Sequence, residues 1–293
     1  MSPPHPELLA REDRIVVSDP PRSFPRPHWR ATATPATQVP PRPVVVEDLV
    51  SPNDIAGLDR QIDKLTMRGV CSRRLGWIGG RPLCALSIAA AKPTLRVVVT
   101  AGVHGIEPAG PAAVLLFLEQ VLQQPRYYDG VEITAVPLVN PVGYHTRSRG
   151  NADRVDLNRA FTDDAVVPRE VALLRNVLQA TRYDLGVDLH SSRSSGRRGY
   201  FTLHRDALDL LAPAMQHFGE RYPVLGESTE RYAFDAKGVF RSSNRGTLKD
   251  YFADSGVRWA VTVESPASLP YAAQVCGTAD IIHTLIATAL ARV

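Results

Sequence analysis

The 293-residue chain has few cysteines, no long apolar run and only a slight charge imbalance. Its three cysteines, Cys71, Cys84 and Cys276, are odd in number and far apart, which argues against a disulfide framework and against a zinc finger. Reduced thiols suit a cytoplasmic protein, and this is the location that we expect. No segment approaches the roughly 20 apolar residues of a membrane helix, and the N-terminal sequence lacks the apolar core of a secretory signal. We therefore expect no membrane partner.

The charge is too balanced to point to one kind of partner. The chain has 34 basic and 30 acidic side chains, a formal charge of +4, which permits anionic partners without requiring them. A nucleic-acid-binding module interleaves aromatic residues with Lys and Arg. In residues 191–249, which carry the excess of basic residues, the arginines cluster instead where a ligand pocket is expected. We therefore expect no nucleic acid partner.

Proline, by contrast, is abundant and unevenly placed. Eleven of the 24 prolines lie in the first 50 residues, and such a density blocks helix interiors and central strands. We therefore predict an irregular, proline-rich arm over residues 1–43 and a single folded domain over residues 44–293.

Apolar periodicity predicts alternating helices and strands in the folded domain. Residues 51–65 have apolar side chains at helical spacing, and Gly79 and Gly80 separate two apolar runs as in a tight hairpin. Further helices are predicted at 111–122, 168–180 and 278–291, and buried strands at 95–100, 133–139, 185–189 and 259–263. This alternation predicts an α/β fold, a single doubly wound, mixed and largely parallel sheet with helices on both faces.

Ionisable residues stand at the ends of three predicted strands. His104 and Glu107 come after the predicted strand at 95–100. His190 directly follows the strand at 185–189, and Glu264 directly follows the strand at 259–263. In doubly wound sheets, ligands bind at the carboxyl ends of the strands. A His and a Glu three residues apart on a turn point the same way, and imidazole nitrogens and carboxylate oxygens suit zinc. A site of His104, Glu107 and His190 would leave a fourth position open, as catalytic zinc sites do.

An H-x-x-E pair alone is weak evidence, because a His near a Glu at a helix start is usually part of a solvated turn. The context strengthens it. Gly102 and Gly105 allow a tight passage from strand to turn, and His190 and Glu264 reach the same edge of the sheet. For Glu264, the alternative is a paired, buried carboxylate without a catalytic role.

Four motifs occur in the order GVHGIE, NPVGYHTRSRGNADRVDLNR, DLH and TVE. Together they resemble the zinc carboxypeptidases of the M14 type and their relatives, the succinylglutamate desuccinylase and aspartoacylase group. The resemblance covers residues 95–293 and implies a zinc carboxypeptidase-like catalytic domain. It also implies one zinc ion per chain, held by His104, Glu107 and His190, with Glu264 as the general base and proton shuttle.

The resemblance further implies roles for four residues of the second motif. Arg149 would polarise the scissile carbonyl and the oxyanion, although other arginines lie nearby and a surface position is the ordinary alternative. Asn158 and Arg159 match the pair that grips the terminal carboxylate of the substrate, unless they only cap the segment. Asp156 would orient one of the ligand histidines.

These groups are chemically consistent with one reaction. Zinc polarises an amide carbonyl and lowers the pKa of its water, a carboxylate carries the proton to the leaving amine, and a guanidinium supplies a permanent positive charge. We predict an enzyme, a zinc-dependent metallocarboxypeptidase that cleaves a peptide amide next to a free C-terminal carboxylate. The alternative is an N-acyl amino acid deacylase of the succinylglutamate desuccinylase/aspartoacylase type. The substrate is then a peptide or an N-acyl amino acid with a free carboxylate.

One tyrosine position departs from the family pattern. Many members have a mobile tyrosine some way before the catalytic glutamate. Here Tyr251 is too near Glu264 for a match and Tyr232 is too far from it. The sequence therefore leaves open which tyrosine, if any, closes over the substrate.

The stretch after His190 bears on the choice of substrate. It contains Arg193, Arg197 and Arg198 within SSRSSGRRGY. It is either a solvated loop or a source of positive potential that favours a substrate with more than one carboxylate. Among the remaining residues of interest, Cys276 is predicted to be a buried thiol just before the last helix. The other histidines are predicted to be structural rather than ligands: His145, His204, His217 and His283.

Overall fold

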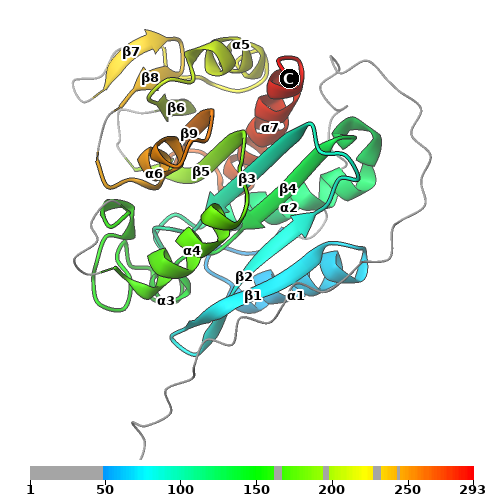
Figure 1. The fold of residues 1–293 in the computed structure, drawn as a ribbon. Coiled ribbons are helices and arrows are strands. Elements are labelled where there is room, and N and C mark those ends of the chain that lie inside the picture. Colours follow the sequence, from blue (N-terminus) through cyan, green and yellow to red (C-terminus); the bar gives the residue numbers. More distant parts are fainter. Residues whose placement is uncertain (1–48, 162–166, 194–197, 227–231, 243–244) are drawn as a thin grey trace, which may run out of the picture. The chain divides into compact units, whose positions relative to one another are not determined.

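A nine-stranded mixed sheet with the strand order β1-β2-β4-β3-β5-β9-β6-β8-β7 is the centre of the fold in the computed structural model (Figure 1). The structure describes residues 49–161, 167–193, 198–226, 232–242 and 245–293, all within one unit that spans residues 33–293. The arm predicted for residues 1–43, and its boundary with the folded domain, lie outside the described residues. The strands are β1 (Cys71–Ile78), β2 (Arg81–Ile88), β3 (Leu95–Ala101), β4 (Val131–Val136), β5 (Leu185–Ser192), β6 (Phe201–His204), β7 (Ala233–Ala236), β8 (Val239–Arg241) and β9 (Trp259–Pro266).

The four central strands, β4, β3, β5 and β9, run parallel to one another. On either side of them the sheet continues with antiparallel pairs, β2 with β4 and β6 with β9, although β6 and β8 are parallel. The mixed, doubly wound sheet predicted from the sequence is thus confirmed, with its parallel part in the middle. Because the central strands are parallel, their carboxyl ends meet at one edge, where ligands bind in sheets of this kind.

The predicted strands are all present, with small differences in their bounds. The hairpin of β1 and β2 turns at Gly79 and Gly80, whose φ angles of 54° and 77° lie in the left-handed region that a two-residue hairpin turn requires. Strand β4 begins and ends earlier than the predicted 133–139. Strands β6, β7 and β8 have only four, four and three residues, and so short a segment shows too little alternation to be recognised from the sequence.

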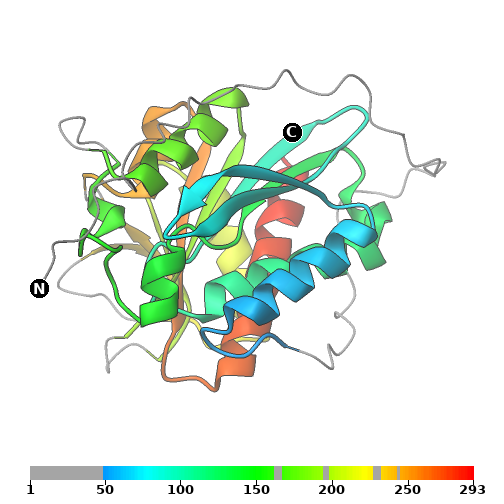
Figure 2. The ribbon, with the colours of Figure 1, turned by 90° about the horizontal axis from the view of Figure 1, so that it is seen from below.

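Helices cover both faces of the sheet (Figures 1 and 2). One face packs against α1, α2, α5 and α7 in the larger apolar cluster, and the other packs against α4 and α6 in a second cluster. The helices are α1 (Ile55–Met67), α2 (Ala109–Gln123), α3 (Pro141–Thr146), α4 (Arg169–Ala180), α5 (Leu208–Phe218), α6 (Leu248–Asp254) and α7 (Tyr271–Leu290), with 3₁₀ turns η1 (Pro125–Tyr128) and η2 (Leu157–Arg159).

The last helix starts earlier than the predicted residue 278. As a result, Cys276 lies inside α7 and is exposed, so the prediction of a buried thiol was wrong. A helical residue faces solvent or core according to its angle around the axis, which flanking residues alone did not show. Among the described residues, α7 is also the one helix long and apolar enough to cross a membrane. Of its most apolar stretch, 72% is buried inside the fold, as in the core helix of a globular domain.

Alternation along β5 decides which of its side chains lie together at the carboxyl edge of the parallel strands. Leu185, Val187 and Leu189 point into the cluster with α2 and α7. The residues between them must point to the opposite face, because successive side chains of a strand alternate. Asp188 and His190 therefore share the face that α6 covers, and this places the polar groups of β5 together.

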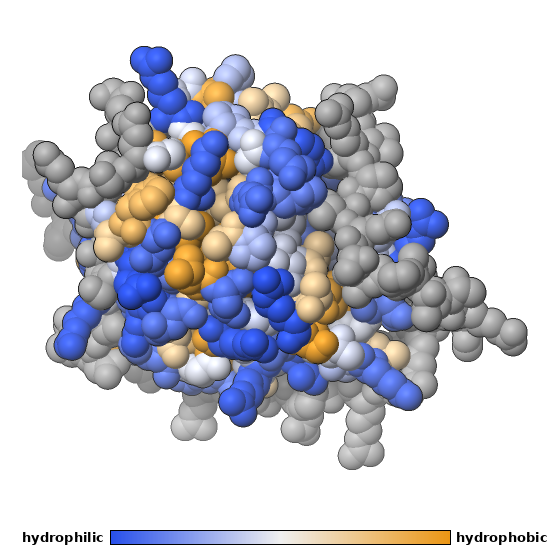
Figure 3. Space-filling view, turned by 90° about the horizontal axis from the view of Figure 1, so that it is seen from above, coloured by the Kyte–Doolittle hydropathy of each residue, from blue (hydrophilic) through white to orange (hydrophobic). Residues whose placement is uncertain are grey.

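Large apolar side chains are exposed singly on several elements. Figure 3 views the molecule from the side on which β7, β8 and α5 lie in Figure 1 and shows hydrophobic residues interspersed with hydrophilic ones. The exposed examples include Phe234 on β7, at 43%, and Trp77 on β1, at 49%. Isolated exposures of this kind are ordinary on protein surfaces.

Candidate metal centre

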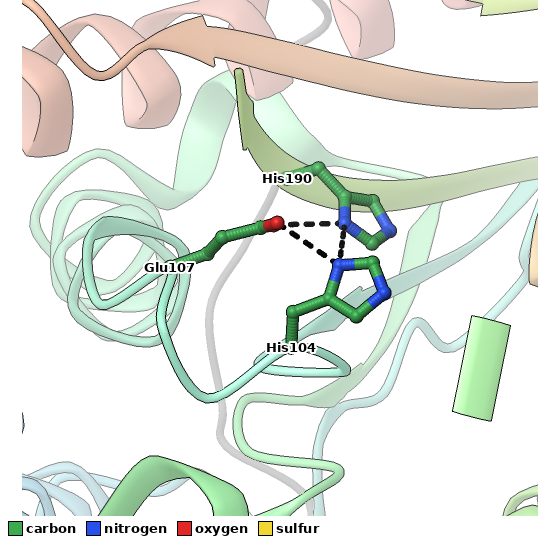
Figure 4. A group of neighbouring side chains, drawn as sticks. All are labelled: His104, Glu107 and His190. Carbon is green, nitrogen blue, oxygen red and sulfur yellow. Dashed lines mark hydrogen bonds and ion pairs between the residues drawn. The ribbon is translucent and has the colours of Figure 1, made fainter. Parts of the chain in front are cut away.

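His104, Glu107 and His190 converge at the carboxyl edge of the parallel strands (Figure 4). His104 and Glu107 lie in the turn that leads from β3 into α2, and His190 lies near the end of the adjacent strand β5. All three are buried, with exposures of 3%, 6% and 3%. Among the described residues they form the one group of this kind that can hold a metal ion, and their ligand atoms all lie within 4.8 Å of one another.

The ligand atoms face a common point. His104 Nδ1 lies 2.9 Å from Glu107 Oε1, and His190 Nδ1 lies 2.9 Å from Glu107 Oε2. The two Nδ1 nitrogens are 3.1 Å apart. Two imidazole nitrogens and one carboxylate are the donor set typical of a catalytic zinc site with an open position. The residues present therefore fit such a metal.

The far nitrogens of both histidines contact carboxylates. His104 Nε2 lies 2.9 Å from Asp156 Oδ1, and His190 Nε2 lies 2.7 Å from Asp188 Oδ2. A carboxylate accepts a hydrogen bond from the Nε2–H of each ring, which leaves the Nδ1 lone pairs directed at the shared point. The placement of Asp156 agrees with the role that the family resemblance implied for it.

Asp188 was missed in the sequence, although a signal for it exists. The spacing D-x-H on a strand places both side chains on one face, and a carboxylate two residues before a ligand histidine can then reach its ring. Asp188 is fully buried, and Thr100 Oγ1 of β3 donates to its Oδ1 at 2.9 Å. This bond fixes the carboxylate with its other oxygen toward His190.

The electrostatics of the centre favour a cation. Burial alone raises the pKa of Glu107, but the charge of His190 and the hydrogen bonds from both histidines outweigh it and lower that pKa well below its usual value. For His190, burial lowers the pKa, but the charges and hydrogen bonds of Asp188 and Glu107 raise it by more. The net pKa of His190 is therefore well above the usual value. The site therefore holds carboxylates in their charged form around two imidazoles.

Arg149 lies at the rim of this cluster. Its Nη2 and Nε lie 3.0 and 3.1 Å from Asp156 Oδ2, and its Nη1 is 3.8 Å from Glu107 Oε1. Partial burial raises the pKa of Asp156, but the hydrogen bond from His104 and the charge of Arg149 outweigh this and lower it. The Arg149 side chain is 47% exposed, so a bound molecule can reach it. Its proposed action on the substrate stays a prediction.

Asn158 and Arg159 are placed differently from each other. Asn158 is buried, its Oδ1 accepts from Leu248 N at 2.8 Å, and its Nδ2 lies 3.2 Å from His190 Nε2. Arg159 is exposed, and its Nη1 donates to the carbonyl of Asn158 at 2.6 Å. Asn158 therefore supports the metal centre from inside, whereas Arg159 is the member of the pair that solvent reaches. Their grip on a substrate carboxylate stays a prediction.

Glu264 is the register partner of His190 on the neighbouring parallel strand β9. Neighbouring strands lie about 4.8 Å apart, and paired residues point to the same face, so Glu264 stands beside the ligand cluster. It is partly exposed, unlike the three ligands. The structure thus brings together all four residues that the sequence placed at strand ends.

The two tyrosines considered in the sequence lie on different parts of the fold. Tyr251, on α6, accepts from Gln179 Nε2 at 3.1 Å, and its ring lies near Phe161. Tyr232 packs on Phe201, which is the register partner of Glu264 on β6.

The basic stretch after His190 is only partly described. Arg193 and Arg198 are exposed, and Arg197 lies outside the described residues. The remaining histidines have surroundings of other kinds: His145 is exposed, His217 is 3.3 Å from Glu220, His204 is 3.0 Å from Asp235, and His283 is buried between Tyr128 and Gln120.

Comparisons with known proteins agree with this geometry. The family model of the succinylglutamate desuccinylase/aspartoacylase catalytic domain matches residues 93–274. A putative metallopeptidase from Shewanella denitrificans OS217 has a similar structure, with a TM-score of 0.69, 23% identity, and coverage of 80% of this chain and 90% of that one. A metallo-carboxypeptidase from Burkholderia cenocepacia is similar with a TM-score of 0.67, 18% identity and coverage of 82% and 70%. No curated protein matches in sequence.

At such identities the structural likeness establishes the fold, and the family follows from the sequence match over more than half of the chain. The matched segment contains the three ligands, both carboxylates behind them and Glu264. The chain therefore belongs to the succinylglutamate desuccinylase/aspartoacylase catalytic domain family, a group of metallohydrolases that shares its fold with the zinc carboxypeptidases.

Proposed function

We propose that the protein is a zinc-dependent hydrolase of an amide bond that lies next to a free carboxylate. One observation carries the proposal. The buried cluster of His104, Glu107 and His190 stands beside Glu264, which is the register partner of His190. A metal-binding cluster and a partly exposed carboxylate on adjacent strand ends are the two parts that metal-assisted hydrolysis requires.

His104 Nδ1, a Glu107 carboxylate oxygen and His190 Nδ1 would hold the zinc, which when bound polarises the amide carbonyl and lowers the pKa of a water. Glu264 takes the proton from the attacking water and later delivers it to the leaving nitrogen. Arg149, at the rim, keeps its positive charge at every working pH and faces the oxygen on which negative charge develops.

Arg159 supplies the contact that orients the substrate. Its exposed guanidinium can form two parallel hydrogen bonds with a carboxylate, a geometry that a single ammonium cannot match. Asn158 holds the backbone of this segment against α6 and His190. A carboxylate bound there places the neighbouring amide over the metal centre.

The family match favours an N-acyl amino acid as the substrate, because the matching model describes acyl-amino-acid hydrolases. The carboxypeptidase predicted from the sequence remains the second candidate, since a pair of Asn158 and Arg159 serves a peptide carboxylate equally well. The likeness to a metallo-carboxypeptidase is a likeness of fold and does not decide between the two substrates. The two functions differ in whether the acyl side of the site accepts a further peptide chain.

Metal analysis of the purified protein combined with Glu264→Gln tests the mechanism. We expect about one zinc per chain in both proteins, with hydrolysis lowered about 10²- to 10⁴-fold in the variant, the usual contribution of a general acid–base group. Glu220→Gln, at an exposed position just after α5, is the matched control and should retain full activity. An active enzyme without metal would refute the mechanism.

A substrate panel separates the two candidates. N-acyl derivatives of Glu, Lys and Leu are compared with dipeptides and longer peptides that end in the same residues. Hydrolysis confined to the N-acyl amino acids supports the deacylase, and turnover of the longer peptides supports the carboxypeptidase. A preference for the N-acyl Glu derivative over N-acyl Lys would support the idea that Arg193 and Arg198 add positive potential to the pocket, and the reverse preference would refute it.

A further inference from the structure

Two asparagine side chains hold the backbone on either side of the ligand His104. Asn140 Nδ2 donates to the carbonyl of Val103 at 3.2 Å, and Asn53 Nδ2 donates to the carbonyl of Gly105 at 3.0 Å. The carbonyls before and after His104 are thus both fixed by amides from other parts of the chain. This matters because the direction of the His104 ring depends on its backbone.

Asn53 reaches the turn that carries His104 from outside the segment that the family model matches. It lies just before α1, whereas the match begins at residue 93. Its φ of 59° is in the left-handed region, which asparagine tolerates better than most residues. The residue that makes this contact therefore lies outside the part of the chain that defines the family.

The same side chain also ties the turn to α3. Asn53 Nδ2 donates a second hydrogen bond to the carbonyl of Tyr144 at 2.8 Å, and Asn53 N donates to the Tyr144 hydroxyl at 3.2 Å. The segment is anchored again at Val50, whose carbonyl accepts from the Tyr271 hydroxyl at 2.8 Å. One amide therefore bridges two backbones, the His104 turn and α3, from a segment that is itself held in place.

The two bridged backbones are already in direct contact. A Cβ placed on Gly105 would lie 1.9 Å from the carbonyl carbon of Gly143, so only glycine permits this approach. Because Gly105 has no side chain, its packing against Gly143 does little to fix the orientation of the His104 turn relative to α3. The hydrogen bonds of Asn53 and Asn140 supply the direction that the contact lacks.

We propose that Asn53 is a positioning residue for the metal centre, whose side-chain amide sets the orientation of the His104 turn and thereby the aim of His104 Nδ1 at Glu107 and His190. The inference rests on the proposed zinc site. It assigns a part in metal binding to the segment before α1, and it predicts that loss of this amide weakens the metal more than it weakens the fold.

Two substitutions separate the amide from the backbone angle. Asn53→Gly keeps the left-handed conformation at no steric cost but removes the amide. Asn53→Asp keeps the shape and places an acceptor where both donors stood. Asn176→Ala, an exposed asparagine on α4, is the matched control.

The dissociation constant for zinc is measured in competition with a chelator, on folded protein, and the visible spectrum of the Co²⁺-loaded protein reports the ligand geometry. We expect zinc to bind about 10-fold more weakly or worse in both Asn53 variants, the range seen when an outer partner of a ligand is lost. The Co²⁺ spectrum should change in both, and Asn176→Ala should match the wild type.

An unchanged zinc dissociation constant in Asn53→Gly overturns the inference, even if its melting temperature falls, because the contact would then serve the fold alone. A wild-type protein that binds no zinc overturns the proposed function together with the inference. The two failures are therefore distinguishable. If Asn53→Asp does not fold, Asn53→Gly decides the matter by itself.

Discussion

His190 and His283 are both buried histidines, at 3% and 5% exposure. The ring nitrogens of His190 contact charged carboxylates, whereas those of His283 contact neutral groups. His190 Nδ1 and Nε2 contact the carboxylates of Glu107 and Asp188. His283 Nδ1 contacts the Tyr128 hydroxyl, and its Nε2 lies 2.6 Å from the amide oxygen of Gln120. The first lies at the carboxyl edge of the sheet and the second in the core helix α7.

The partners decide what each ring can do. Burial lowers the pKa of His283 to about 3, helped by the charge of Arg221, so this ring is neutral in the folded protein. Burial acts on His190 in the same direction, but two carboxylates reverse the outcome and raise its pKa. Burial of a histidine alone therefore indicates nothing about function, whereas a histidine among buried carboxylates marks a place prepared for positive charge.

Replacement of each histidine should show the largest difference between the two regions. His190→Ala removes a ligand, and we expect zinc affinity to fall by more than the roughly 100-fold that loss of an outer partner can cause. Hydrolysis should be lost with the metal. His283→Ala should keep the metal and the zinc affinity while lowering the melting temperature. Metal content and thermal unfolding of both variants check this, and loss of zinc in His283→Ala would break the comparison.

The loss of stability on metal removal should depend on His190 and not on His283. A chelator should lower the stability of the wild type by about 2.7 kcal/mol relative to protein with free zinc at 100 times its dissociation constant. His190→Ala should show no such response, and His283→Ala should show the full one. Thermal melts with and without chelator measure it. An equal response in all three proteins would mean that zinc binds elsewhere.

Neutralising one carboxylate should make the metal centre more like the His283 site. Asp188→Asn keeps the size of the side chain but loses the charge behind His190, so we expect zinc to bind about 10- to 100-fold more weakly. The variant should fold, because Thr100 Oγ1 can still donate to the amide oxygen. Chelator competition measures the effect, and a zinc affinity equal to that of the wild type would show that the charge of Asp188 is unimportant.

The smallest effect is a pH dependence of stability that comes from His283. Its pKa is about 3 in the folded chain and near 6.5 when unfolded, so below pH 6.5 the unfolded chain binds a proton that the folded chain does not. Its contribution to stability is complete above pH 6.5 and falls as the pH drops toward 3. Between pH 7.5 and 5.5 this amounts to about 1.4 kcal/mol.

His283→Gln has no such titration and should lose less stability over the same interval. Denaturant unfolding of both proteins at the two pH values, each with chelator present, gives the difference. Because all other groups titrate in both proteins, equal losses would show that His283 is not the group responsible.

Local patterns were enough to predict the main elements and the four strand-end residues. The central strands β3, β5 and β9 are rich in apolar residues, and their buried character shows directly in the sequence. The short strands β6, β7 and β8 were not predicted, because they exist through pairing with β9 and with each other. The exposure of Cys276 was not predicted, because it depends on which face of α7 packs against α2 and α5.

The sequence by itself determined the donor set, because ligand chemistry depends on residue type and on the order of the strands that end in His104, Glu107, His190 and Glu264. Tertiary structure alone decided the contacts that aim those donors. Thr100 meets Asp188 across two strands, and Asn53 reaches Gly105 from a segment 52 residues away. Side-chain hydrogen bonds between distant segments leave no periodic signal, so only the folded chain shows that Thr100 holds Asp188 and that Asn53 holds the turn of His104.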